Sequence, residues 1–379
     1  MTTTRLTEIL RRPIDAATRE RAALHVLDWL GCALVGATTE PGIALRRWSA
    51  REEPGTGPCT IVLGGRGTLW TALVANGGVG NILEMDDIHR TAILHPGPVI
   101  VPAALALAER ENASSAAFLN AVIRGYEAAI RIGRSLGPAH YRYWHNTATG
   151  GVFGAAAAAG SLLNLPVAQM VDALGNAGTQ ASGLWQVRLE PVMGKQLHNG
   201  RAAHAGVLAA DLAQHGFTGA QAILEGPLGF FNAMCPDGKI ERVTAGSDAP
   251  WLIYETGFKP WPACRHAHPT IDAALALAGG VYADDIDTVE IRSYKDAVTI
   301  CDRVHPSTAV DAKFSLQHSA AVVFLRGKPS LGDYEPATFN EPRFRAFRKR
   351  VKLTLAEPYA SRFPAHFGAE ITIRLKTGE

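Results

Sequence analysis

The sequence contains few cysteines and has no excess of charge of either sign. Its 379 residues include five cysteines, and 37 Lys and Arg against 35 Asp and Glu leave a formal net charge of +2. An odd number of widely spaced cysteines does not fit a disulfide scaffold, so we expect free thiols and a cytoplasmic location. Scattered, nearly balanced charge also argues against a nucleic-acid-binding protein and against a protein that binds anionic membranes.

Long apolar runs and the common nucleotide and hydrolase motifs are absent as well. The most apolar stretches, such as Gly151–Leu165, are short and rich in alanine, so no membrane span is predicted. The N-terminus is a polar helix start rather than a signal peptide. The sequence has no G-x-x-x-x-G-K-[ST], H-E-x-x-H or G-x-S-x-G motif. The glycines of GNAGTQASG lack the preceding strand that a dinucleotide site requires.

The first two-thirds of the chain has the pattern of a helical domain. A length of 379 residues favours two domains. Small residues dominate GVFGAAAAAG and GRAAHAGVLAADLA, which predicts helices that pack closely. Helical periodicity predicts one helix after the caps Asp15 or Thr18, and others over Val101–Glu109, Ala116–Leu136, Gly151–Leu163, Val167–Ala177, Gly200–His215 and Gly219–Glu225.

The pattern changes after Phe258. Alternation of apolar and polar residues predicts strands over Thr288–Tyr294, Val351–Leu355 and Ala369–Lys376, with helices over Pro269–Leu277 and Phe314–Leu325 between them. The expected fold is therefore mainly α, with a large all-helical domain over residues 1–257 and a smaller α+β lid domain over residues 258–379. Irregular connections are expected around Pro227–Pro250 and Gly327–Arg343.

Two segments of the helical part combine acid–base groups with helix starts. The first, DDIHRTAILHPGPVIVP (86–102), has two adjacent carboxylates, two imidazoles and an HPG turn before an apolar helix. An Asp that orients a His produces a competent general base, although both acids could also simply cap or link helices. The second, WHNTATGGVFG (144–154), places His145 before a turn that opens a helix. Such a turn attracts anions, and a plain N-cap explains Thr147 and Thr149 equally well.

Two further segments carry cationic and thiol groups. In MGKQLHNGRAAHAG (193–206), Lys195 precedes a helix of small residues and could project into a cleft, whereas His198 and His204 fit a helix surface or a core. In FKPWPACRHAH (258–268), prolines stiffen the chain around Lys259 and Cys264. The trio C-x-H-x-H suggests a metal site, but no second pair of ligands accompanies it, so we predict neither a metal nor a cofactor.

Taken together, these segments resemble the MmgE/PrpD family, which includes 2-methylcitrate dehydratase, cis-aconitate decarboxylase and an iminodisuccinate epimerase. The resembling elements occur in family order. They are DDIHRTAILHPGPVIVPAALALAE, HNTATGGVFGAAAAAGSLL, KQLHNGRAAHAGVLAADLAQHGFTGAQAILEGPLGF, FKPWPACRHAHPTIDAALAL and AKFSLQHSAAVVFLRGK. The resemblance implies a homodimer whose large helical domain is joined to a smaller α+β lid, with the active site in the cleft between them.

The resemblance also implies site residues. Asp86 and His95 match the family's Asp and the His of its HP motif, and Lys195 matches the Lys before the small-residue helix. By similarity the candidate site residues are His95, Asp86, Lys195, Lys259, His145, Cys264 and His318, with Cys264 where the decarboxylase has a His acid/base candidate.

Three features depart from the family pattern. The tripeptide His95–Gly97 is HPG where the dehydratases tend to have HPS. At His318 family members often carry Tyr. The chain also ends before the C-terminal segment that usually returns to the helical domain, so that segment is expected to be absent.

The resulting hypothesis is a cofactor-independent lyase that acts on a small polycarboxylic acid. His95, oriented by Asp86, would move a proton on a carbon next to a carboxylate, and Lys195 and Lys259 would neutralise the resulting dianion in a shared crevice. A hydro-lyase similar to 2-methylcitrate dehydratase is preferred. The alternatives are a decarboxylase of a cis-aconitate-like acid, an epimerase of an iminodisuccinate-like acid, and a catalytically silent dicarboxylate binder or scaffold.

Overall fold

A computed structural model describes residues 1–52, 56–190 and 192–378, and its internal contacts divide the chain into two compact units. Unit 1 comprises Met1–Ile82 and Asp86–Phe258, and unit 2 comprises Leu83–Met85 and Lys259–Glu379. The sequence places its domain boundary between residues 257 and 258. Unit 1 ends one residue later, and unit 2 takes in three residues from the middle of the helical part.

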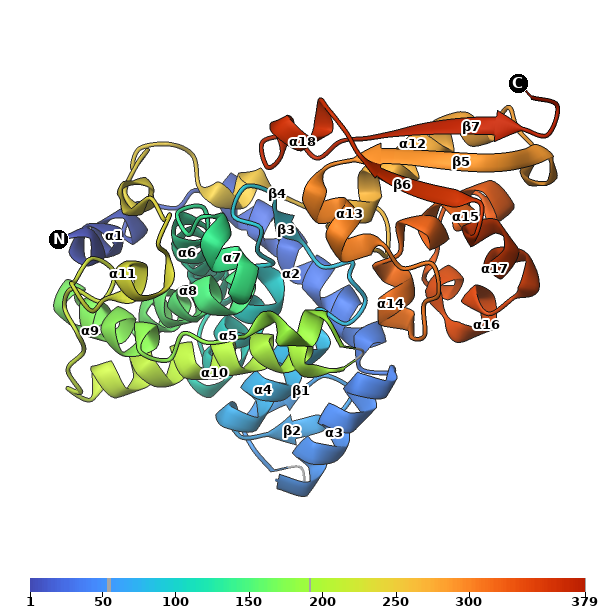
Figure 1. The fold of residues 1–379 in the computed structure, drawn as a ribbon. Coiled ribbons are helices and arrows are strands. Elements are labelled where there is room, and N and C mark those ends of the chain that lie inside the picture. Colours follow the sequence, from blue (N-terminus) through green and yellow to red (C-terminus); the bar gives the residue numbers. More distant parts are fainter. Residues whose placement is uncertain (53–55, 191, 379) are drawn as a thin grey trace. The chain divides into compact units, whose positions relative to one another are not determined.

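Unit 1 consists mainly of helices, labelled in Figure 1. Its helices are α1 (Thr2–Leu10), α2 (Ala16–Gly36), α3 (Glu40–Glu52), α4 (Leu69–Val79), α5 (Gly97–Arg110), α6 (Ser115–Gly133), α7 (Pro138–Tyr143), α8 (Asn146–Leu162), α9 (Val167–Gly178), α10 (Gly194–Gln214) and α11 (Phe230–Met234). Its strands are β1 (Cys59–Ile61), β2 (Gly65–Gly67), β3 (Ile88–His89) and β4 (Thr256–Gly257).

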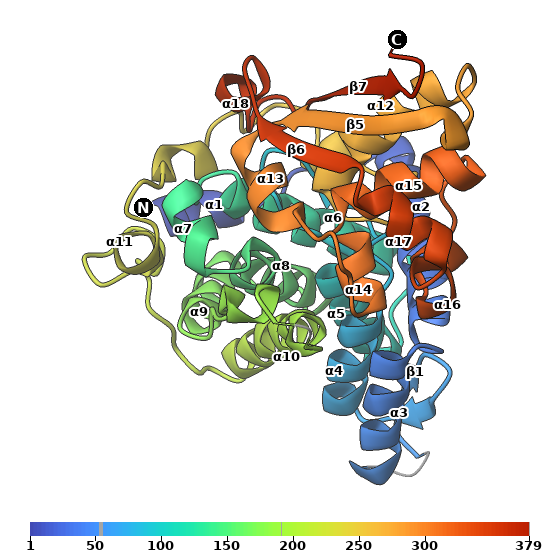
Figure 2. The ribbon, with the colours of Figure 1, turned by 45° about the vertical axis from the view of Figure 1, so that its right-hand side comes forward.

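The core of unit 1 is built around α8, which packs against α5, α6, α9 and α10 (Figures 1 and 2). Glycines allow these helices to approach closely. A Cβ on Gly154 would lie 2.7 Å from the carbonyl oxygen of Gly125 on α6, and a Cβ on Gly206 of α10 would lie 2.5 Å from the carbonyl oxygen of Val152. The close packing predicted from the small residues of this region is therefore confirmed.

Two parts of unit 1 differ from the predicted all-helical domain. β1 and β2 form an antiparallel hairpin, and β3 pairs with β4. The predicted helix Gly219–Glu225 is wrong, because residues 221–225 form turns and residues 219 and 220 have no regular structure. A single helical turn ends where the Gly226 amide donates to the Ala222 carbonyl, and the Phe230 amide then donates to the Ile223 carbonyl as the chain reverses. Glycines at 226 and 229 and proline at 227 favour this reversal over a continued helix.

Unit 2 combines a three-stranded sheet with short helices. Its strands are β5 (Ile286–Ser293), β6 (Val351–Leu355) and β7 (Ala369–Leu375), and its helices are α12 (His268–Ala278), α13 (Lys295–Cys301), α14 (Ala309–Lys313), α15 (Leu316–Arg326), α16 (Pro336–Phe339), α17 (Pro342–Arg348) and α18 (Tyr359–Arg362). The order is β6-β5-β7, with β6 parallel and β7 antiparallel to the central β5.

The sheet of unit 2 buries one face. Val289 and Ile291 of β5 are buried, whereas Glu290 between them is exposed, as the sequence alternation predicts. Helices α12 and α15 pack together and contact the sheet through β7 and β6 (Figure 1). The predicted fold class, mainly α with an α+β second part, is thus confirmed.

No single helix among the described residues is long and apolar enough to cross a membrane. The consecutive helices α2 and α3 reach that length and composition only as a pair, with a bend of 88° between them.

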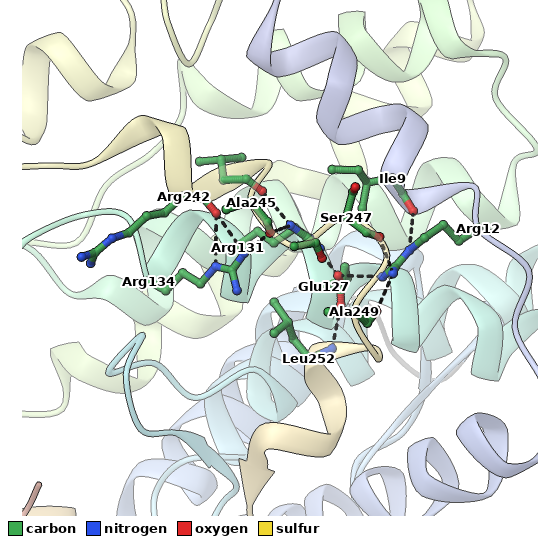
Figure 3. A network of polar contacts seen from close by, with 12 residues as sticks. Ile9, Arg12, Glu127, Arg131, Arg134, Arg242, Ala245, Ser247, Ala249 and Leu252 are labelled. Atoms are coloured by element: carbon green, nitrogen blue, oxygen red, sulfur yellow. Dashed lines mark hydrogen bonds and ion pairs between the residues drawn. The ribbon is translucent and has the colours of Figure 1, made fainter. Parts of the chain in front are cut away.

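A buried carboxylate fastens an irregular segment to the helical core (Figure 3). Glu127 of α6 is fully buried and accepts from Arg12 at 2.9 Å, from Arg131 at 2.8 Å and from the Leu252 amide at 2.8 Å. Arg131 in turn donates to the carbonyls of Val243, Ala245 and Gly246. The connection predicted around Pro227–Pro250 is therefore held at its C-terminal part by charged groups.

Candidate active site

The first element of the candidate site is a histidine held beside a buried aspartate. His95 Nδ1 lies 2.9 Å from Asp86 Oδ2, as an ion pair whose angle is outside that of a directional hydrogen bond. Asp86 is 1% exposed and accepts from the Asn81 side-chain amide at 2.7 and 2.6 Å, and the His95 side chain is 12% exposed. A carboxylate at Nδ1 favours the proton on that nitrogen, which leaves Nε2 as the basic atom.

The neighbouring aspartate fixes the backbone just after His95. Asp87 accepts from the Gly97 amide at 2.9 Å, from the Tyr126 hydroxyl at 2.7 Å and lies 2.6 Å from His25 Nδ1. Burial, together with the charge of Asp87, raises the pKa of Tyr126 well above its ordinary value, so this hydroxyl remains a donor. Asp87 is fully buried and serves to position the start of α5, on which the orientation of His95 depends.

Gly97 is sterically required at this position, and we expect Gly97→Ala to destabilise the protein by about 1–3 kcal/mol. A Cβ there would lie 2.8 Å from Asp87 Oδ1, and three hydrogen bonds hold that carboxylate in place. Gly31 in α2 provides the matched control, because a Cβ there would meet nothing within 4 Å. Helix propensity should make Gly31→Ala neutral or stabilising by up to about 1 kcal/mol. Urea unfolding measures both, and a stabilised Gly97→Ala variant would show that the contact is easily relieved.

A second histidine lies close to His95 in unit 1. The His95 amide donates to Thr147 Oγ1 at 3.0 Å, which links the start of α5 to the first turn of α8. His145, the N-cap residue of α8, is 2% exposed, lies 3.3 Å from His198 Nδ1 through its own Nδ1, and packs on Trp185 with ring centroids 4.3 Å apart. His198 was predicted to lie on a helix surface or in a core; it is half-buried on α10, and its ring lies beside that of His145.

The surroundings of His145 are cationic. Burial, followed by the charge of Lys195 and those of the neighbouring histidines, lowers the pKa of His145 well below its ordinary value. Burial and Lys195 also lower the pKa of His198. Because Lys195 acts on both imidazoles, its ammonium group lies near them, and His145 is neutral at physiological pH.

The N-termini of three helices meet at this cluster. His95 and Pro96 precede α5, His145 precedes α8, and Lys195 is in the first turn of α10. None of the three has a side-chain cap at its N-cap residue, but the Gly97 amide of α5 donates to Asp87, so the first amide groups available to an anion are those of α8 and α10. The positive ends of the helix dipoles and Lys195 together favour a small organic anion here.

Unit 2 holds two of the predicted residues in a cluster of its own. Lys259 is 5% exposed, and its Nζ donates to the Glu84 carbonyl at 2.9 Å and approaches Glu84 Oε2 at 3.4 Å. Cys264 is hydrogen-bonded to the buried thiol of Cys301. Burial and the charge of Glu84 would raise the pKa of Cys264, but the hydrogen bonds with Cys301 and the His266 backbone, together with the charge of Lys259, lower it. The prediction that Lys259 shares a crevice with His95 and Lys195 stays a prediction.

The three side chains of the C-x-H-x-H segment each contact a different residue. Cys264 meets Cys301, His266 Nδ1 lies 2.7 Å from the Tyr294 hydroxyl, and His268 Nε2 lies 3.2 Å from the Ala263 carbonyl. Across residues 1–52, 56–190 and 192–378, no three His, Cys, Asp or Glu side chains are grouped so that they could hold a metal ion.

His318 occupies the core of unit 2. It is fully buried, Nε2 lies 2.8 Å from the Asp333 carbonyl, and Nδ1 lies 3.3 Å from Arg348 Nη1. Both ring nitrogens thus have partners that fit one neutral tautomer. Packing alone accounts for His318, so we leave it out of the proposed mechanism, and its catalytic role stays a prediction.

His318 should make the protein sensitive to acid. Burial lowers the pKa of His318 from 6.5 to about 4. The unfolded chain therefore binds a proton that the folded chain refuses, so the stabilisation is fully present above pH 6.5 and is lost as the pH falls towards 4, by up to about 3 kcal/mol. Urea unfolding at several pH values should show a flatter acid slope in His318→Gln. The exposed His366→Gln is the control, and equal slopes in wild type and both variants would contradict the assignment.

Comparison with known proteins identifies the family. The MmgE/PrpD N-terminal domain matches residues 6–243 and the MmgE/PrpD C-terminal domain matches residues 261–379. The chain is 26% identical over 403 residues to a cis-aconitate decarboxylase-like protein of Aspergillus oryzae, a match that covers 99% of this chain and 83% of that protein.

Two further relatives carry different activity names. A cis-aconitate decarboxylase of Aspergillus terreus is 32% identical over 69% of this chain, and the chain spans 56% of that protein's length. A 2-methylcitrate dehydratase of Escherichia coli (strain K12) is 26% identical over 50% of this chain and 41% of that protein. Both family domains match in their expected order and together take in most of the sequence. The chain therefore belongs to the MmgE/PrpD family.

Proposed function

We propose that this protein is a lyase that acts on a small polycarboxylic acid by proton transfer at a carbon next to a carboxylate. The observation that carries the proposal is a histidine held by a buried aspartate beside the uncapped N-termini of α8 and α10. This arrangement combines an anion-binding environment with a general acid–base group, and the chemistry needs no organic cofactor or metal.

In the proposal, Lys195 and the amides at the helix starts bind the substrate carboxylates. A carbanion next to a carboxylate is a dianion, and fixed positive charge stabilises it more than it stabilises the ground state. Neutral His145 can donate a hydrogen bond to the same anion without adding a charge that must be desolvated. Lys259 and Cys264 remain in the proposal as a second candidate cation and a candidate proton donor, on the resemblance and on the geometry of unit 2.

His95 is the proposed proton-transfer group. For decarboxylation, the bond to a carboxylate breaks, carbon dioxide leaves, the electron pair is delocalised along a neighbouring double bond, and imidazolium His95 delivers one proton to carbon. For dehydration, His95 takes a proton from carbon, the electron pair forms the double bond, and a hydroxide leaves with a proton from a second donor. Asp86 stabilises the imidazolium in both cases.

The relatives favour decarboxylation over the hydro-lyase that the sequence suggested. Two matches that extend over 99% and 69% of this chain carry cis-aconitate decarboxylase names, whereas the 2-methylcitrate dehydratase match extends over 50%. We therefore propose decarboxylation of an unsaturated tricarboxylic acid as the first candidate reaction and dehydration of a 2-methylcitrate-like acid as the second.

Incubation with cis-aconitate, 2-methylcitrate and citrate, followed by mass spectrometry, tests the proposal. Loss of carbon dioxide from cis-aconitate supports the first candidate, and loss of water from either hydroxy acid supports the second. A separate incubation with an iminodisuccinate-like acid, followed by chiral chromatography, tests the epimerase alternative. Calorimetric binding of these acids without any turnover would instead favour the silent binder and contradict the lyase proposal.

A further inference from the structure

A cavity of about 220 Å³ lies in unit 1 among α1, α6, α8 and α9. Its polar lining includes Thr7, Arg11, Arg124, Ser161 and Asn164, and Val167 lines it from the first turn of α9. No acidic side chain lines it among the described residues. The charged groups of this cavity are therefore two guanidinium groups.

Among the described residues, no carboxylate pairs with either of these two arginines. Arg124 Nη1 donates to Ser161 Oγ at 2.6 Å, and Arg11 Nη1 donates to the Leu165 carbonyl at 3.3 Å, so both bind neutral oxygens. Arg124 Nε is buried and has no hydrogen-bond partner within residues 1–52, 56–190 and 192–378. Burial, then the charge of Arg11, lowers the pKa of Arg124, and no acid opposes this.

Nearby arginines of the same unit show the contrast. Arg131, seven residues further along α6, has its charge matched by Glu127, as does Arg12, the residue after Arg11 (Figure 3). Arg110 on α5 pairs with Glu111 and Asp211. Arg131, Arg12 and Arg110 thus have carboxylate partners, whereas Arg11 and Arg124 donate to neutral oxygens, as Arg21 and Arg46 do elsewhere in unit 1.

The first turn of α9 adds a third source of positive potential. This helix has 12 residues, and its N-cap residue Pro166 provides no side-chain acceptor for the first amide groups. Unpaired amides at a helix start bind anions, and guanidinium groups bind carboxylates and phosphates through two hydrogen bonds. The cavity therefore combines charge, hydrogen-bond donors and enough volume for a small molecule.

We propose that this cavity is a binding site for a small oxyanion, a phosphate or a carboxylate group, held between Arg11 and Arg124 at the start of α9. Ser161 orients the Arg124 guanidinium. The site does not depend on the function proposed above.

The cavity is distinct from the candidate active site. His145 caps the N-terminus of α8, and Ser161 lies in the last turn of the same helix. At about 1.5 Å of rise per residue, the two ends are roughly 24 Å apart. An anion at Arg124 cannot be the one that the His95 and Lys195 cluster binds.

Calorimetric titration of the whole chain with inorganic phosphate, and separately with citrate, at constant ionic strength tests the site. The wild-type protein should bind one equivalent of phosphate or citrate. Substitution of the cavity arginines should weaken or abolish this binding. Arg124→Gln and Arg11→Gln should each raise the Kd of that equivalent roughly tenfold or more, because each removes a charged donor. If only one of the two anions binds more weakly to these variants, the site prefers the chemical group of that anion, phosphate or carboxylate.

Two controls separate this site from other anion binding. Arg5→Gln changes an exposed arginine of the same helix α1 that pairs with Glu8, and the Kd should stay within about twofold. Lys195→Gln removes the cation of the candidate active site and should leave this binding unchanged. Arg11 is exposed, so Arg11→Gln should fold even if Arg124→Gln does not. The proposal would be overturned if Arg11→Gln left the Kd of both anions unchanged. It would also be overturned if Lys195→Gln abolished the binding.

Discussion

We expect His95→Ala to lower kcat by roughly 10²–10⁴-fold while leaving the free energy of unfolding nearly unchanged. The side chain is 12% exposed at a cluster of helix ends, and the backbone contact from the His95 amide to Thr147 survives the substitution. The variant therefore loses the proton-transfer group and little packing. Steady-state kinetics on the acid that the enzyme turns over, together with urea unfolding, measures the two effects.

Two further variants make this result interpretable. Asp86→Asn keeps the size of the side chain and removes the charge that stabilises the imidazolium, so kcat should fall. His215→Ala changes an exposed histidine at the other end of α10 and should leave kcat unchanged. If His95→Ala unfolds the protein while activity per folded molecule is retained, His95 is a structural residue.

We expect Glu127→Gln to destabilise unit 1 by about 3–5 kcal/mol. Glu127 is fully buried, and its carboxylate is the charge partner of Arg131, whose side chain is 1% exposed, and of Arg12 (Figure 3). The amide of Gln cannot neutralise them, so a buried guanidinium remains without its counter-charge. Urea or thermal unfolding measures the loss.

The exposed pair of Arg5 and Glu8 is the control for this prediction. It has a similar separation, 2.8 Å, but both side chains are about half exposed, so Glu8→Gln should cost less than about 1 kcal/mol. A Glu127→Gln variant as stable as Glu8→Gln would show that the buried network is not needed to hold the 242–252 segment on α6.

Most of the long helices of unit 1 and the strands β5, β6 and β7 of unit 2 could be predicted from sequence because their patterns are local, whereas α3 and α4 were not predicted. Small residues at helical spacing predicted α8 and α10, and strict alternation predicted β5, β6 and β7. Gly219–Glu225 failed because its composition allows a helix, while glycines and a proline just beyond it favour a reversal that propensity over seven residues does not show. The short β1–β2 hairpin and the β3–β4 pair, of two or three residues each, gave no periodic signal.

The candidate site could be predicted in its residue types but not in its geometry. Adjacent carboxylates beside an HPG turn indicated the acid–base pair, and the structure brings Asp86, His95, His145 and Lys195 together in unit 1. The separate roles of the two adjacent aspartates could not be read from the sequence, because Asp86 meets His95 whereas Asp87 meets Tyr126 and Gly97. The roles of the two aspartates depend on contacts between segments that are distant in sequence.

Residues that the sequence did not single out complete the environment of the site. Asn81 donates to both oxygens of Asp86, and Trp185 packs on His145. Neither belongs to a motif, and their positions depend on where α4 and the segment before α10 pack. For the Arg11 and Arg124 cavity, the two residues lie 113 positions apart, so no local pattern could have connected them.

Solvent-deuterium incorporation tests the proton-transfer role of His95 most directly. The acid that is turned over is incubated with enzyme in D₂O, and NMR follows the carbon next to the carboxylate. We predict one carbon–deuterium bond per decarboxylated product, or exchange into the acid during reversible dehydration, at a rate that falls by at least about 10²-fold in His95→Gln while calorimetry still shows substrate binding. Deuterium that enters carbon equally fast in wild type and His95→Gln would contradict the assignment of His95.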